Sequence, residues 1–197
     1  MSSTIITLAV LAIAAFYIVS IYNKLVALQN RYENGFAQIE VQLKRRYDLI
    51  PNLLETAKAY LSHERETLEA VVKARNTALS GLAAAASNPS STNAIKELAS
   101  AEGVLSSALG KLNLVVENYP ELKANSTMLA FSEELATTEN KVAFARQAFN
   151  DFVMEYNSYR ESFPPVFFAS FFGHRSNAAL LEFQDSEKIQ EAPKVQF

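Results

Sequence analysis

The stretch LQNRYENGFAQIEVQLKRRYDLI, residues 28–50, decides the fold of this chain. Large apolar side chains recur in it at spacings of four, four and three residues, and they are Leu28, Tyr32, Phe36, Ile39, Leu43, Tyr47 and Ile50. An eleven-residue repeat corresponds to about 3.67 residues per turn, so these side chains stay on one face of a nearly straight α-helix. The stretch therefore predicts a long helix with one apolar face, which needs partner helices to cover it.

An uncharged segment, TIITLAVLAIAAFYIVSIY, precedes this helix and occupies residues 4–22. About 20 apolar residues in a helix that rises ~1.5 Å per residue are enough to cross the hydrocarbon core of a bilayer. A cleaved signal peptide is the alternative, with Ala12-Ile13-Ala14 as its small-residue site, but no Lys or Arg precedes the apolar run. We therefore expect an uncleaved transmembrane anchor over residues 1–23 that continues into the helix of residues 28–50.

Charged residues near the anchor predict its orientation. Residues 1–3 contain no Lys or Arg, whereas Lys24 and Arg31 follow the span, and a basic run, Lys44-Arg45-Arg46, comes soon after. Positively charged flanks tend to stay in the cytoplasm. We expect a single-pass protein with its N-terminus outside the cell and its remaining domain in the cytoplasm.

Pro51 interrupts the apolar pattern of the first helix. Because proline has no N–H, it deprives the Tyr47 carbonyl of its helical hydrogen bond, and it restricts the backbone of Ile50. A kink or a break is predicted here, with Asp48 as the N-cap of a new helix. The apolar pattern then resumes and fades at the loop-forming cluster of residues 87–91, and its seam consists of Leu54, Ala57, Leu61, Glu64, Leu68, Val71 and Arg75.

Two further helices are predicted from apolar residues that alternate at spacings of three and four. The first runs from about Asn93 to Glu117. The second begins after Asn125 or Ser126, either of which can act as an N-cap, and the prolines of Phe163-Pro164-Pro165 stop it. Its seam continues over more than four heptads, which is typical of left-handed packing against antiparallel neighbours.

The composition of the 197 residues supports a helical fold and excludes several classes of function. Gly (5) and Pro (6) are scarce, which favours helices over strands. A net charge of −3 provides no basic surface for nucleic acid, whose phosphates are neutralised by clustered Lys and Arg. No cysteine is present, so disulfides and thiolate metal sites are excluded.

The predicted fold is therefore all-α. The N-terminal transmembrane helix, residues 1–23, continues into a bundle of long helices over residues 24–173, and a polar C-terminal tail occupies residues 174–197. Short connections between the helices predict an up-and-down, antiparallel bundle.

Three ionisable residues occupy seam positions whose neighbours are apolar, and they are Glu64, Arg75 and Glu102. A charge inside a bundle must be paired, because an unpaired charge there costs several kcal/mol. We expect these residues to be buried and structural, with a Glu–Arg pair that specifies helix register. A carboxylate metal site is the alternative.

Neither histidine completes a metal-binding or catalytic motif. Di-iron bundles use Glu-x-x-His, but Tyr60 precedes His63 by three residues and Phe171 precedes His174. The zinc-protease motif His-Glu-x-x-His begins at His63 but has Thr67 in place of the second histidine. Since the sequence also lacks a Gly-rich phosphate loop and a Ser-His-Asp order, we expect no cofactor, no metal site and no enzymatic activity.

An aromatic segment after the double proline is the strongest candidate for a functional contact, and it contains Phe163, Phe167, Phe168, Phe171 and Phe172. Aromatic residues at this density either plug one end of the bundle or form an exposed patch that contacts the membrane or a partner. The run Lys44-Arg45-Arg46 also has two interpretations. It is a solvated helix face, or it contacts anionic headgroups if the helix bends back at Pro51.

Several motifs closely resemble the signature of the bacterial LemA family. The most specific is QIEVQLKRRYDLIPNL at residues 38–53, and further matches are EAVVKARN at 69–76, VENYPELKA at 116–124, TENKVAFAR at 138–146 and PKVQF at 193–197. The resemblance covers the chain from Tyr22 to the C-terminus, in order and at the right spacing. One departure is Gly35-Phe36, where the family commonly has Ala-Trp, so the ring is kept but the indole N–H donor is lost.

The resemblance implies an N-terminal anchor in the bacterial inner membrane, a bundle of long helices, no cofactor and no established enzymatic activity. We expect the protein to contact the lipid bilayer and to self-associate into a homo-oligomer that acts as a structural scaffold. The alternative is an adaptor that uses its Phe-rich end to bind another membrane protein, such as a membrane protease.

Overall fold

The computed structural model describes residues 2–183, and these residues form helices and loops without any strand. The helices are α1 (Ser2–Lys58), α2 (Arg65–Ser87), α3 (Thr92–Glu117), α4 (Pro120–Lys123), α5 (Ser126–Glu161) and α6 (Pro165–Ala169). The predicted fold class is confirmed, because a long apolar N-terminal helix leads into helices that pack as a bundle.

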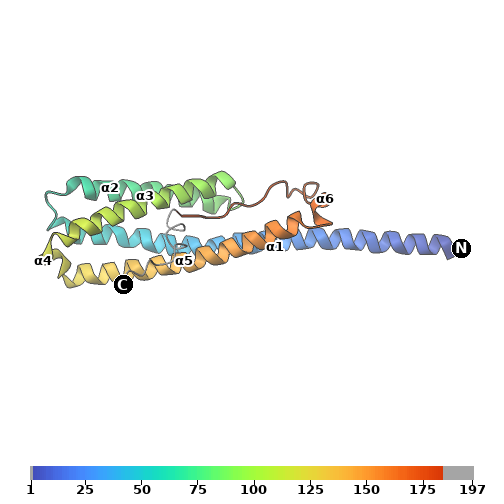
Figure 1. Ribbon diagram of the computed structural model, residues 1–197, viewed down its shortest axis with the longest axis horizontal. Helices are drawn as coiled ribbons and strands as arrows, with labels where there is room; N and C mark the ends of the chain where they lie inside the picture. Colours follow the sequence, from blue (N-terminus) through green and yellow to red (C-terminus); the bar gives the residue numbers. More distant parts are fainter. Residues whose placement is uncertain (1, 184–197) are drawn as a thin grey trace, which may run out of the picture.

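The long helices pass up and down along one axis, as Figure 1 shows. α1 packs mainly against α5, and α2 packs mainly against α3, while contacts between α1 and α2 join the two pairs. The short helix α4 links α3 to α5 at the end of the bundle far from the N-terminus. The short helix α6 lies at the opposite end, beside α1. Helices that are neighbours in the chain therefore run antiparallel, as predicted.

The predicted apolar stripe of residues 28–50 forms the α1 side of the core. None of its seven side chains is more than 3% exposed. Phe149 of α5 packs edge-to-face against Phe36, with 5.7 Å between ring centroids, and against Tyr32 at 6.3 Å. Such aromatic pairs contribute about 0.5–1.5 kcal/mol beyond the area that they bury. The eleven-residue repeat thus identified the face of α1 that α5 covers.

Of the kink or break predicted at Pro51, the break is wrong. α1 continues through Pro51 to Lys58 as one helix, so Asp48 does not cap a new one. The carbonyl that proline leaves without its helical donor belongs to Tyr47, and Nε of Arg75 in α2 donates to it at 2.8 Å. A neighbouring helix therefore replaces the hydrogen bond that the proline removes.

The chain instead turns at residues 59–64, between α1 and α2. The seam predicted from Leu54 to Arg75 is thereby divided between two helices. The later boundaries agree with the prediction. Ser91 caps α3 by accepting from the N–H of Ala94, and Asn125 caps α5 by accepting from the N–H groups of the second and third residues that follow it.

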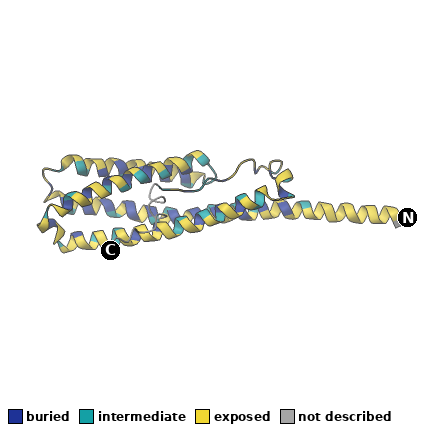
Figure 2. Ribbon diagram, in the orientation of Figure 1, coloured by how far each residue is buried: buried dark blue, intermediate teal, exposed yellow. Residues whose placement is uncertain are grey.

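The N-terminal part of α1 projects alone from the bundle (Figures 1 and 2). Residues 3–17 are all exposed although most of them are apolar, and Ile21 is the first buried residue. By length and composition, α1 is the one helix among the described residues that is able to cross a membrane. A projecting apolar surface of this size marks a membrane or protein contact.

Candidate functional site

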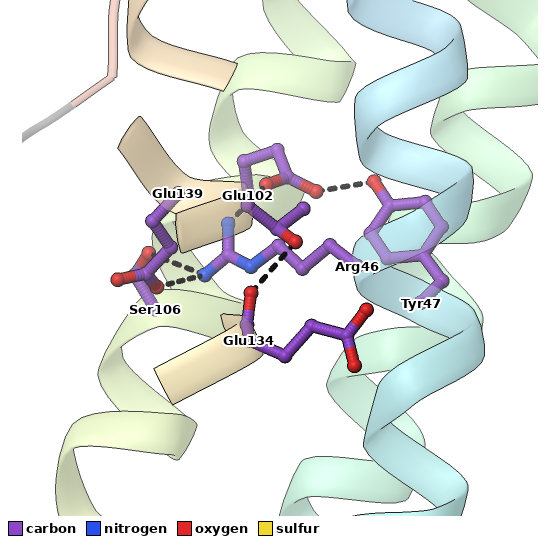
Figure 3. Close-up of polar contacts among 7 residues, drawn as sticks. Arg46, Tyr47, Glu102, Ser106, Glu134 and Glu139 are labelled. Atoms are coloured by element: carbon purple, nitrogen blue, oxygen red, sulfur yellow. Dashed lines mark hydrogen bonds and ion pairs between the residues drawn. The ribbon is translucent and has the colours of Figure 1, made fainter. Parts of the chain in front are cut away.

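A group of polar side chains around the buried residues Arg46 and Glu102 joins α1, α3 and α5 (Figure 3). Glu102 of α3 is 1% exposed, and its two carboxylate oxygens accept from Nη1 of Arg46, at 2.9 Å, and from the hydroxyl of Tyr47. Arg46 also donates to Glu139 of α5 at 3.0 Å and to Ser106 of α3 at 3.3 Å. We call these five residues the Arg46 cluster. It combines two residues predicted to be buried, Glu102 and Tyr47, with partners that the sequence did not indicate.

Burial dominates the electrostatics of the Arg46 cluster. It raises the pKa of the Glu102 carboxyl, while the charge of Arg46 and the hydrogen bond from Tyr47 act against this rise. Burial and the negative charge of Glu102 raise the pKa of Tyr47 far above its ordinary value of 10. The side chains of Glu102 and Arg46 are almost completely buried, so a solute does not reach them. This arrangement is suited to holding three helices in register.

The other two residues predicted as buried, Glu64 and Arg75, are half-buried and have different partners. A Glu64 oxygen accepts from the hydroxyl of Tyr119 at 3.4 Å. Arg75 donates to the main-chain carbonyl of Tyr47, and also to the side-chain oxygen of Asn76 at 3.3 Å. Arg75 therefore satisfies a carbonyl of α1, and the buried Glu–Arg pair is made by Glu102 and Arg46.

The basic run Lys44-Arg45-Arg46 does not lie at the membrane end of the bundle. Lys44 pairs with Glu40 on α1, and Arg45 pairs with Glu134 of α5 at 2.7 Å. Arg46 is 3% exposed, so its predicted place on a solvated or headgroup-contacting face is wrong. Because α1 does not bend back at Pro51, the run lies about 33 Å along the helix from Tyr22, at ~1.5 Å per residue.

The aromatic segment includes the short helix α6 and lies next to the point where α1 leaves the bundle (Figure 1). Phe168 and Phe172 are half-buried and stack on each other, with 6.2 Å between centroids, and Phe172 meets the edge of Tyr22 at 5.3 Å. Three other rings point into solvent, and we call them the Phe platform: Phe163, Phe167 and Phe171, which are 82%, 72% and 87% exposed. Phe168 and Phe172 therefore pack against the bundle, whereas the three rings of the Phe platform form an exposed patch.

Sequence reasoning missed a set of α5 side chains that hold the extended chain after α6. Asn157 donates to the carbonyl of Ala178 at 3.0 Å and accepts from its N–H at 2.9 Å. Asn150 makes the same two bonds with Leu181, at 3.2 and 2.9 Å. We call Asn150 and Asn157 the Asn clamp. Their spacing of seven residues places both amides on one face of α5, which is a signal that the sequence contained.

Arg160, one turn further along α5, also binds the segment that follows α6. Its guanidinium donates to the main-chain carbonyls of His174 and Arg175, at 2.9 and 2.7 Å, and to the side chain of Asn177 at 2.8 Å. The hydroxyl of Tyr156 lies 3.0 Å from Nδ1 of His174, and burial lowers the pKa of this histidine. The polar tail was predicted to start at residue 174, whereas residues 174–183 pack along α5 and the rest of the tail lies outside the described residues.

Other parts of the described chain offer little chemistry. Residues 3–183 contain no group of three or more His, Asp or Glu side chains placed to hold a metal ion. A shallow groove of about 510 Å³ follows the outer face of α2, and it is lined by Glu69, Val72, Lys73, Asn76, Thr77 and Ser80. Since these residues belong to a single helix, no second element brings an opposing group to the groove.

Comparison with known sequences decides the family. The sequence model that describes the LemA family matches residues 35–197, which is most of the chain. The chain belongs to the LemA family. Protein LemA of Metamycoplasma hominis is similar to it, with 29% identity over 151 residues, and the alignment covers 76% of this chain. The aligned part spans 64% of the length of that relative.

The LemA family match begins at Gly35, where this chain departs from the Ala-Trp that we expect in the family. A Cβ atom on Gly35 would lie 2.9 Å from the Phe152 ring of α5, closer than carbon atoms normally approach. The guanidinium of Arg31 covers the same ring at 4.5 Å. Phe36 itself is buried against Phe149.

Proposed function

We propose that this LemA-family protein is a single-pass membrane scaffold that assembles side by side with copies of itself in the bacterial inner membrane. The observation that most supports the proposal is the continuity of α1, which runs as one helix from the apolar segment into the core of the bundle. Because no loop separates the anchor from the bundle, every copy holds its bundle at the same height above the bilayer. The side faces of neighbouring copies then meet in register.

Exposed apolar side chains on the flanks of the bundle offer contacts for this assembly, and they include Val41, Val104, Leu114 and Met154. Such residues are individually common on the surface of monomers. Confinement in a membrane raises the effective concentration of neighbouring copies, so weakly apolar faces are sufficient for association. The burial of Arg46 and Glu102 within the Arg46 cluster supports a structural role in preference to a catalytic one.

Light scattering of the full chain in a mild detergent tests the proposal. The chain has a mass of 21.8 kDa, and we expect a protein mass several times larger after the detergent is subtracted. Two differently tagged copies that are expressed together should also purify together. A single protomer without partners contradicts self-assembly. A single copy that purifies with another membrane protein, such as a membrane protease, supports the adaptor alternative.

The proposed orientation places the bundle in the cytoplasm, because Lys24 and Arg31 follow the apolar segment. The chain has no cysteine, so a single cysteine introduced at Ser87, the exposed last residue of α2, is a specific probe. A membrane-impermeant maleimide should label this cysteine only after the cells are lysed. Rapid labelling of intact cells would reverse the orientation.

A further inference from the structure

The Phe platform is an apolar surface that the bundle itself does not cover. Phe163, Phe167 and Phe171 follow one another at intervals of four residues, and the rings of Phe163 and Phe167 meet edge-to-face at 5.9 Å. Phe171 rests against Phe172, with 5.8 Å between centroids, and Phe172 packs against the core. Phe171 is therefore supported by a half-buried ring, and Phe163 and Phe167 support each other.

The height of the Phe platform along the molecule is set by its contact with α1. Phe172 touches Tyr22, which is the last residue of the uncharged segment 4–22. In a helix of ~1.5 Å rise per residue, this segment extends for about 28 Å, close to the ~30 Å thickness of the hydrocarbon core. When α1 spans the membrane, Tyr22 lies at the boundary between acyl chains and headgroups, and α6 lies beside it.

We propose that the Phe platform is a second membrane contact, which inserts Phe163, Phe167 and Phe171 into the interfacial region of the leaflet from which α1 emerges. The inference rests on the proposed membrane anchor. The bilayer is the occupant that the position favours, because aromatic side chains gather at this depth in membrane proteins. Exposed cations, Lys24 and Arg175, lie close in sequence to the contact and suit anionic headgroups.

A second membrane contact would restrict how the bundle is oriented on its anchor. A single helix leaves the bundle free to tilt and to rotate about the axis of α1. A second contact at one side of that axis restricts the tilt and the rotation, because burying the platform opposes any motion that lifts it into water. The platform thus determines which helix faces of the bundle meet between neighbouring copies.

Tryptophan fluorescence tests the inference directly, because the chain contains no tryptophan. Four single-tryptophan variants of the full chain are placed in vesicles of phosphatidylcholine and phosphatidylglycerol, with or without phosphatidylcholine brominated on its acyl chains. Phe167→Trp and Phe171→Trp report on the platform. Phe16→Trp, in the projecting apolar segment, reports on the anchor. Phe144→Trp is the matched control, because Phe144 is 74% exposed on α5, between the residues that pair with Arg45 and Arg31.

Bromine near the headgroups should quench Phe167→Trp and Phe171→Trp roughly twofold, because interfacial side chains reach about 5–10 Å into the boundary of headgroups and acyl chains. Bromine deep in the acyl chains should quench Phe16→Trp more than either of them. Phe144→Trp should keep its emission in both kinds of vesicle.

The outcomes separate the platform from the anchor. If Phe16→Trp is quenched while the two platform variants behave like Phe144→Trp, the platform inference is overturned and the anchor stands. Platform variants with blue-shifted emission but no quenching overturn it as well, because their rings are then buried against protein. If Phe16→Trp itself escapes quenching, the proposed anchor fails, and the platform inference fails with it.

Discussion

Nε of Arg75 in α2 donates a hydrogen bond of 2.8 Å to the main-chain carbonyl of Tyr47 in α1. This carbonyl is the one whose helical donor is missing because residue 51 is proline. The bond explains how α1 continues through Pro51 without a break, and it attaches α2 to α1 at that point.

A double-mutant cycle tests this relationship. Arg75→Met should destabilise the full chain by about 1–3 kcal/mol, because it leaves the Tyr47 carbonyl without a donor. In a Pro51→Ala background, residue 51 supplies the helical N–H, so Arg75→Met should cost clearly less. Thermal unfolding in detergent, followed by circular dichroism, measures both costs. An equal cost in the two backgrounds would show that Arg75 acts independently of the proline.

Removing the cation of the Arg46 cluster should be far more harmful than removing its exposed neighbour. Arg46→Met leaves the Glu102 carboxylate buried without a cation, which typically costs about 3–5 kcal/mol. Arg45→Met breaks the exposed pair with Glu134 and should cost less than about 1 kcal/mol. Unfolding of the two variants under the same conditions gives the comparison. Similar costs would mean that burial does not distinguish the two arginines.

The raised pKa of Glu102 predicts how stability depends on pH. Its carboxyl binds a proton more readily in the folded chain than in the unfolded chain, where its pKa is near 4.5. The stabilising effect of the raised pKa is therefore fully present below that value and is lost as the pH rises above it. The difference in unfolding free energy between the unmodified chain and Glu102→Gln should fall with rising pH. A difference that stays constant between about pH 4 and pH 8 would contradict the shift.

The Asn clamp should control whether residues 174–183 remain attached to α5. Each asparagine makes two hydrogen bonds to the segment, so Asn150→Ala or Asn157→Ala should weaken its attachment by about 1–2 kcal/mol. Hydrogen exchange at the amides of Ala178 and Leu181 should then speed up roughly 5- to 30-fold. Asn140→Ala, an exposed change on the same helix, is the control. Unchanged exchange in the clamp variants would show that apolar contacts alone hold the segment.

The aromatic segment predicts opposite results for two pairs of substitutions. Phe168→Ser with Phe172→Ser should destabilise the chain by about 2 kcal/mol or more, because both rings pack against the core. Phe167→Ser with Phe171→Ser should change stability in detergent by less than about 0.5 kcal/mol, because these rings are exposed. Melting curves of the two double variants measure both changes in stability. Equal destabilisation would place all four rings in the core.

Much of the fold was predictable because its signals are local. The spacing of apolar residues in 28–50 requires one buried helix face, whichever partner covers that face. Asn125 was available as a cap because its side-chain oxygen reaches the N–H groups only two and three residues ahead. The aromatic segment was also found from the sequence, but its division into supporting and exposed rings was not.

The errors share one physical cause. Pro51 predicts a break when its neighbours in the chain are considered alone, and the donor that prevents the break lies on α2. Arg46 resembles a surface cation because it lies in a basic run, yet it is buried and pairs with Glu102 in the interior.

The sequence by itself determined the helical class, the apolar faces, the caps and a segment able to cross a membrane, since each depends on residues within a few turns of one another. Only the tertiary structure decided which carboxylate pairs with Arg46, how α1 passes Pro51, and where residues 174–183 lie. Those outcomes depend on hydrogen bonds between groups far apart in the chain, and such groups become neighbours only after the helices have packed.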